Sequence, residues 1–118
     1  MSVPLWILLI VLTLAFLASG GLKLTQPKES LRERMRWVES FSSTQIKAIG
    51  GLEVLGALGL ILPAVAKTAH WLIPTAALGL TAMMIGASIT HIRIKDPISQ
   101  VVPSAVLGVL SLVLALFV

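Results

Sequence analysis

Residues 3–22 read VPLWILLIVLTLAFLASGGL, twenty consecutive positions that contain no charged side chain. At a helical rise of about 1.5 Å per residue, this stretch extends roughly 30 Å, the thickness of the hydrocarbon core of a bilayer. Hydrocarbon offers no partner for backbone amides, so a stretch that crosses it must be a helix or a strand of a closed barrel. Because apolar and polar residues do not alternate here, the stretch predicts a transmembrane helix.

Three further stretches, at 44–62, 71–90 and 101–118, are of similar length and equally apolar. Of the 14 charged residues in the chain (nine basic and five acidic), the four stretches contain only Lys47 and Glu53. The connections between stretches are short enough for consecutive helices to run antiparallel. The sequence therefore predicts an all-α integral membrane protein, a four-helix up-and-down bundle in a lipid bilayer.

The composition of the whole chain points the same way, with 57% hydrophobic residues, 12% charged residues and a mean hydropathy of +1.00. A soluble domain would carry about 25% charged residues. The composition excludes the class of ordinary water-soluble domains and predicts one transmembrane domain over residues 1–118, with no soluble catalytic domain beside it. The absence of cysteine excludes disulfides, thiolate metal sites and thiol chemistry by the chain's own residues.

Basic residues gather in two of the three connections between the predicted helices. Eight lie in or beside the first and third connections, whereas only Lys67 lies in the second. By the positive-inside rule, the first and third connections face the cytoplasm and both termini lie outside it. Basic loops beside anionic headgroups also account for the net charge of +4, so no nucleic-acid partner is expected. The eight residues are Lys23, Lys28, Arg32, Arg34, Arg36, Lys47, Arg93 and Lys95.

The first connection has an apolar pattern of its own over residues 28–41. Leu31, Met35, Val38 and Phe41 recur at spacings of four, three and three, and charged residues fill the other positions. This pattern predicts a short amphipathic helix that lies on the cytoplasmic headgroups. The alternative is a docking surface for a soluble partner.

Local signals place the ends of the predicted helices. Ser42 and Gln45 have the spacing of a capping box that starts the helix at 44–62. Pro63 begins the second connection, while Pro74 and Pro103 are expected in the first turns of the two following helices, where a missing N–H has little effect.

Small residues recur at packing intervals on the last three predicted helices. Within lipid, close backbone approach through small residues drives helix association. The stripes therefore predict a compact bundle, and the stripe on the last helix suggests contact with another copy of the chain, a homo-oligomer. That last stripe consists of Ser104, Gly108, Ser111 and Ala115.

Glu53 is the one acidic residue inside a predicted span. It lies ten residues from Pro63, about 15 Å deep and near the bilayer midplane. A charge there costs roughly 2.5–3.5 kcal/mol, so such residues are normally functional, paired or protonated. Lys23 lies at the cytoplasmic end of the first predicted helix and His91 at the cytoplasmic end of the third. Both are therefore candidate partners of Glu53 in a polar, ligand-binding cluster. No metal site is expected, and no nucleophile beside a base identifies the chain as an enzyme.

Three segments match a pattern found in one family: GGLKL at the end of the first helix, GGLEVLGALGLIL in the second, and ASITHIRIKD at the exit of the third. The chain resembles the DoxX-like family of small four-helix bacterial membrane proteins over nearly its whole length. The resemblance implies a place in the bacterial cytoplasmic membrane and a relation to the membrane subunit of a thiosulfate:quinone oxidoreductase. It also implies a link to redox-stress systems, with Lys23, Glu53 and His91 in the family's usual context.

Three functions follow as hypotheses. The first is a membrane subunit or accessory protein whose Glu53 cluster binds a small molecule or a quinone head; apart from quinone, no cofactor is expected. The second is a proton-coupled exporter, in which Glu53 exchanges a proton for a cation. The third is a structural or assembly role with a membrane-protein partner, in which residues 28–41 form the contact.

Overall fold

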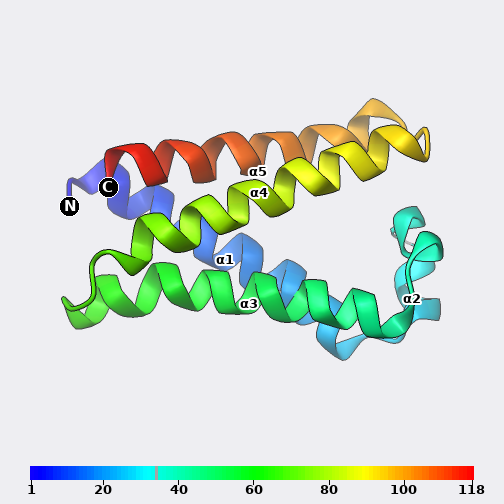
Figure 1. Ribbon diagram of the computed structural model, residues 1–118, viewed down its shortest axis with the longest axis horizontal. Coiled ribbons are helices and arrows are strands. Elements are labelled where there is room, and N and C mark those ends of the chain that lie inside the picture. The colour runs from blue at the N-terminus through cyan, green and yellow to red at the C-terminus, as the bar shows by residue number, and fades with distance from the viewer. Residues whose placement is uncertain (34) are drawn as a thin grey trace.

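The computed structural model describes residues 1–33 and 35–118, so Arg34 of the basic set lies outside the described residues. Four long helices, α1, α3, α4 and α5, run alternately up and down the long axis of the molecule, as Figure 1 shows. Together with a short connecting segment they confirm the predicted all-α four-helix bundle. The elements in order are α1 (Val3–Thr25), α2 (Lys28–Arg32), the 3-10 helix η1 (Arg36–Ser40), α3 (Ser43–Ala66), α4 (Leu72–Arg93) and α5 (Ile98–Phe117).

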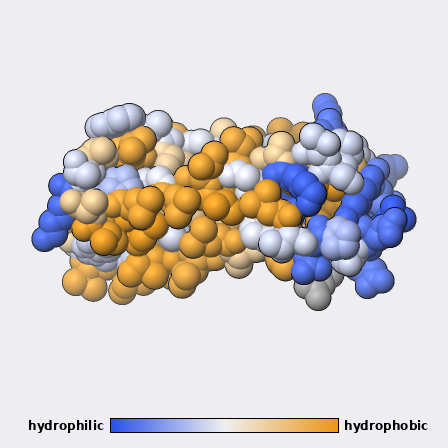
Figure 2. Space-filling model, turned by 90° about the horizontal axis from the view of Figure 1, so that it is seen from below, coloured by the Kyte–Doolittle hydropathy of each residue, from blue (hydrophilic) through white to orange (hydrophobic). Residues whose placement is uncertain are grey.

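The outer surface of the bundle is apolar along its length. Figure 2 shows an apolar band around the middle of the molecule and polar residues gathered at its ends. Aliphatic side chains such as Leu14, Leu55, Leu78 and Val109 are more than half exposed. Each of the four long helices is long and apolar enough to cross a membrane. The chain is therefore a small multi-pass membrane protein whose aliphatic exterior suits lipid.

Inside the bundle, α1 packs against α3 and α4 against α5, while α3 and α4 hold the two pairs together. Large core side chains such as Leu12, Phe16 and Leu60 are fully buried. Close approach depends on glycine. A Cβ added at Gly56 would lie 2.7 Å from Cδ2 of Leu80, and one at Gly59 would lie 3.0 Å from the Cβ of Ala76.

The small residues of α5 pack against α4 of the same chain. A Cβ added at Gly108 would lie 3.1 Å from the Cβ of Met84, and the hydroxyls of Ser88 and Ser104 are 3.0 Å apart. The stripe thus has a partner within the bundle, and contact with a second copy stays a prediction.

The prediction that α3 ends before Pro63 was wrong, as was the prediction that Pro103 lies in the first turn of α5. α3 continues through Pro63 to Ala66, because a proline in the last turn removes only one helical hydrogen bond. The carbonyl of Pro63 still accepts a hydrogen bond from the Lys67 N–H. Lys67 then takes a left-handed conformation with φ of 53° and ends the helix. α5 begins three residues earlier than expected, at Ile98, so Pro103 lies in its second turn.

The start of α3 agrees with its predicted signal. The Ser42 hydroxyl accepts from the Gln45 N–H at 3.1 Å, and the Gln45 side chain accepts from the Ser42 N–H at 2.9 Å, which confirms the capping box. Pro74 lies in the first turn of α4, as predicted.

The prediction of a single amphipathic helix over residues 28–41 was wrong. The segment forms α2 and then η1, and Met35 between them is extended, with φ of −128° and ψ of 92°. This break lets Val38 fold back on Leu31 and pack with Ile46 at the start of α3 in a small core of their own. The predicted apolar residues do cluster, but tertiary packing replaces the continuous helix.

Candidate functional site

The site begins at the point where α1 and α3 touch most closely. A Cβ added at Gly20 would lie 2.6 Å from the carbonyl oxygen of Gly50, and one added at Gly50 would lie 2.8 Å from the carbonyl oxygen of Gly20. Each of these glycines begins a Gly-Gly-Leu tripeptide that a charged residue follows, Lys23 on α1 and Glu53 on α3. Because the helices run antiparallel, this contact brings the two opposite charges together.

Lys23 and Glu53 form a buried ion pair. Nζ of Lys23 donates to Oε1 of Glu53 at 2.6 Å, and the two side chains are only 8% and 1% exposed. Nζ also donates to the Ser19 hydroxyl at 2.6 Å, one turn back on α1. The same ammonium lies 5.6 Å from the ring centroid of Trp37, within the range of a cation–π interaction.

Glu53 retains one carboxylate oxygen with no partner. Among the described residues, no group donates a hydrogen bond to its buried Oε2. A buried acceptor left unsatisfied costs about 1–3 kcal/mol, or more when it is charged. This oxygen is therefore the place where an additional donor would gain most.

A cavity of about 500 Å³ adjoins this ion pair. It is mostly apolar, and its wall is formed by side chains of α1, the η1 region, α3, α4 and α5. Trp37 and Phe41, which cover it from the η1 side, pack edge to face with ring centroids 5.5 Å apart. The lining residues include Ser19, Lys23, Met35, Trp37, Phe41, Leu52, Glu53, Met83, Met84, Gly86, Thr90, His91, Gln100 and Ser104.

His91 lines the same cavity, but its bonded partner is Asp96 and not Glu53. Nδ1 of His91 lies 2.7 Å from Oδ2 of Asp96, whose side chain is only 2% exposed. Oδ1 of Asp96 lies 3.6 Å from the Arg36 guanidinium, which ties η1 to the turn between α4 and α5. The structure thus places the three predicted site residues around one cavity, with Lys23 and Glu53 in contact and His91 in a second polar group.

Asp96 was not among the predicted site residues. After α4 ends, Lys95 adopts a left-handed conformation with φ of 58°, and the Asp96 N–H donates to the His91 carbonyl at 2.9 Å. This hydrogen bond, together with the one from the Lys95 N–H to Ile92, is the Schellman pattern, and it folds Asp96 back onto His91. Glycine usually marks this pattern in a sequence, and here lysine occupies the position.

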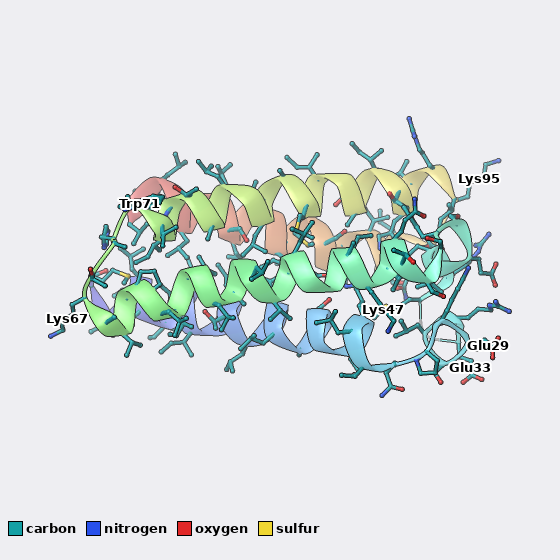
Figure 3. The ribbon with its side chains drawn as sticks, turned by 60° about the horizontal axis from the view of Figure 1, so that its bottom comes forward. Glu29, Glu33, Lys47, Lys67, Trp71 and Lys95 are labelled. Carbon is teal, nitrogen blue, oxygen red and sulfur yellow. The ribbon has the colours of Figure 1, made fainter. Side chains whose placement is uncertain are left out.

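Lys47 is a charged group outside the cavity, at the end of the bundle where the other labelled charged residues except Lys67 gather (Figure 3). Lys47 donates to the Leu24 carbonyl at 3.0 Å at the exposed end of α1, and Figure 3 shows it at the same end as Glu29, Glu33 and Lys95. In the part of the chain that the structure describes, no three His, Asp or Glu side chains gather where they could hold a metal ion.

The comparisons with known proteins give one match. A family model described as the DoxX-like family matches residues 7–114, nearly the whole chain. No curated protein and no solved structure matches.

Proposed function

Because the chain belongs to the DoxX-like family, we propose that it is a small-molecule-binding membrane protein that serves a quinone-linked redox or stress system as a subunit or accessory. Its binding site is the cavity beside Glu53, and its ligand is a small amphipathic molecule of the quinone type. The observation that carries the proposal is a buried acid in the lining of a cavity: Glu53, whose Oε2 has no hydrogen-bond partner among the described residues.

The size and lining of the cavity support a ligand of this kind. A volume of about 500 Å³ falls within the range of small-molecule sites, which are mostly apolar with a few polar groups that set orientation. Trp37, Phe41 and the methionines offer apolar and aromatic surface for a ring. Leu52 on α3 and Gly86 on α4 are exposed while they also line the cavity, so an apolar tail has a path between these helices toward lipid.

Trp37 provides a local reporter of binding, because it lines the cavity and the other two tryptophans do not. A Trp6→Phe/Trp71→Phe protein in micelles retains only Trp37. We expect short-chain quinones and quinols to quench its fluorescence saturably.

The matched control uses two glycines on α4. An added Cβ meets nothing within 4 Å at Gly86 or at Gly79, which lies two turns earlier outside the cavity. Gly86→Leu fills the cavity and should weaken binding at least tenfold, whereas Gly79→Leu should leave it unchanged. Equal effects of the two variants, or quenching that never saturates, would exclude the cavity as the binding site.

We also propose that the protein lies in the bacterial cytoplasmic membrane with both termini outside the cytoplasm. Figure 3 shows Lys67 and Trp71 at one end of the bundle and the other labelled charged residues at the opposite end, an asymmetry that supports this orientation. The chain has no cysteine, so single cysteines can be introduced at Lys67 and Lys95 without further change. An impermeant maleimide added to intact spheroplasts should label the first and not the second; the reverse pattern would invert the topology.

An exporter function has weaker support from the geometry. A carboxylate that exchanges protons for cations has to lose any fixed counter-ion, and Glu53 is paired with the Lys23 ammonium at 2.6 Å. Proton-driven cation flux in proteoliposomes, lost in Glu53→Gln, would favour this alternative. A structural role predicts instead that deletion of residues 28–41 abolishes co-purification of a membrane partner without loss of insertion.

A further inference from the structure

We propose that the cavity selects its ligand by hydrogen-bond polarity, and that it binds a head carrying a hydroxyl donor, of the phenol or hydroquinone class, in preference to a carbonyl head of the same shape. The inference rests on the proposed function, since it concerns the ligand of the same cavity. It says which chemical form of an aromatic ligand the site retains.

Two of the three hydrogen-bond donors of Lys23 are already engaged. An ammonium has three N–H groups, and two of them serve Glu53 and Ser19. The ammonium also lies over the Trp37 ring. A ligand carbonyl that entered the cavity would therefore find only one N–H of Lys23 without a hydrogen-bond partner.

Glu53, in contrast, has spare capacity to accept. A carboxylate in an ion pair is an acceptor only, with two oxygens and about four acceptor sites. Lys23 uses Oε1, and Oε2 has no donor among the residues that the structure describes. Glu53 lines the cavity, so a ligand hydroxyl that reaches this oxygen would satisfy it, whereas a carbonyl there would set two acceptors against each other.

His91 and Asp96 form a second polar group beside the cavity. When Nδ1 of His91 donates its hydrogen to the Asp96 carboxylate, the neutral ring presents Nε2 as an acceptor. The Thr90 and Ser104 hydroxyls donate to backbone carbonyls of their own helices, at 2.9 Å in both cases. The Ser19 hydroxyl, the Gln100 amide and the Trp37 indole N–H also line the cavity and can donate, but all three are neutral. A hydrogen bond to an ionised oxygen is roughly twice as strong as a neutral one, so Glu53 sets the preference.

Three probes with one carbon skeleton test the inference under anaerobic conditions. They are trimethylhydroquinone, its dimethyl ether, and trimethyl-p-benzoquinone. Each is titrated into the protein that retains only Trp37, and the ether is also measured by displacement of the hydroquinone. Saturation midpoints are compared, because the amplitudes of quenching differ between the probes. We expect the hydroquinone to bind about 10–100-fold more tightly than the other two, the effect of one charge-assisted hydrogen bond.

Replacement of the Glu53 carboxylate should change the relative affinities of the three probes. Glu53→Gln supplies an N–H₂ group, so the preference for hydroquinone over benzoquinone should fall at least tenfold. The double variant Lys23→Met/Glu53→Gln leaves no unpaired ammonium and serves if the single variant does not fold. Glu33→Gln, at an exposed position outside the cavity, is the control and should keep the wild-type order.

The outcomes separate the two proposals. If all three probes bind equally and Gly86→Leu weakens all of them, the cavity is a binding site without polarity selection, and only this inference fails. Tighter binding of the benzoquinone than of the hydroquinone would likewise overturn it. If no probe changes Trp37 fluorescence saturably, the proposed function fails, and this inference fails with it.

Discussion

The contact between Gly20 and Gly50 gives the sharpest test of how the bundle is built. Gly20→Ala puts a methyl group 2.6 Å from a backbone oxygen of α3. Restoring a carbon–oxygen distance of about 3.3 Å requires the helices to separate by roughly 0.7 Å. Such overpacking costs about 1–3 kcal/mol. The same movement stretches the Lys23–Glu53 hydrogen bond beyond its optimal length, and a bond of this kind contributes about 1.5–3 kcal/mol.

Alanine is the better helix former by about 0.8–1.0 kcal/mol, which offsets part of this loss. The free energy of unfolding should therefore fall by roughly 2–5 kcal/mol in Gly20→Ala. Gly21→Ala is the matched control, because a Cβ added there meets nothing within 4 Å, and this variant should be neutral or slightly stabilised. Both are measured by SDS titration in mixed micelles, with Trp37 fluorescence as the probe. Equal unfolding midpoints for the two variants would refute the close contact.

Three further perturbations test other parts of the structure. In a double-mutant cycle, Lys23→Met and Glu53→Gln should each lower the free energy of unfolding by about 3–5 kcal/mol, and the double variant by clearly less than their sum, because each single change strands a buried polar partner. Additive losses would contradict the pairing. Ser42→Ala removes the capping box and should lower stability by about 1 kcal/mol, against less than about 0.5 kcal/mol for Ser43→Ala at the exposed first position of α3. Asp96→Ala releases the ion pair that ties η1 to the end of α4, so amide hydrogen exchange in η1 should accelerate while exchange in α1 stays constant.

The membrane spans could be predicted from the sequence because their signal is strong and local. Twenty apolar residues in succession have few alternatives, and the capping box at Ser42 depends on only four positions. The ends of α3 and α5 were harder, since Pro63 and Pro103 are compatible with a helix that continues as well as with one that stops. What decides is the neighbouring backbone geometry, here the left-handed Lys67. That geometry has no distinct sequence signal without glycine.

The site shows the same division between local and tertiary information. Depth in the membrane and helix direction were enough to relate Glu53 to Lys23, whose side chains lie in contact. The position of Asp96 depends on the turn after α4, and the cover of the cavity depends on the break at Met35. The first is a local turn in which lysine stands where glycine is usual, and the second is set by packing of Leu31 and Val38 against Ile46 of α3, so hydrophobic periodicity alone could supply neither.

Helix packing and the chemistry of the cavity are linked through one contact. Gly20 and Gly50 allow α1 and α3 to approach until Lys23 reaches Oε1 of Glu53, and that reach determines which carboxylate oxygen is satisfied and which is left without a donor. If α1 moved away, Lys23 would be free to bind a ligand carbonyl, and Glu53 would gain a second free oxygen. The close contact therefore does more than stabilise the bundle, because it leaves Glu53, a cavity-lining residue, with a hydrogen-bond acceptor, Oε2, that has no donor among the described residues. Gly50→Ala should consequently narrow the preference for a hydroxyl-bearing ligand in protein that still folds, and Gly51→Ala should preserve it.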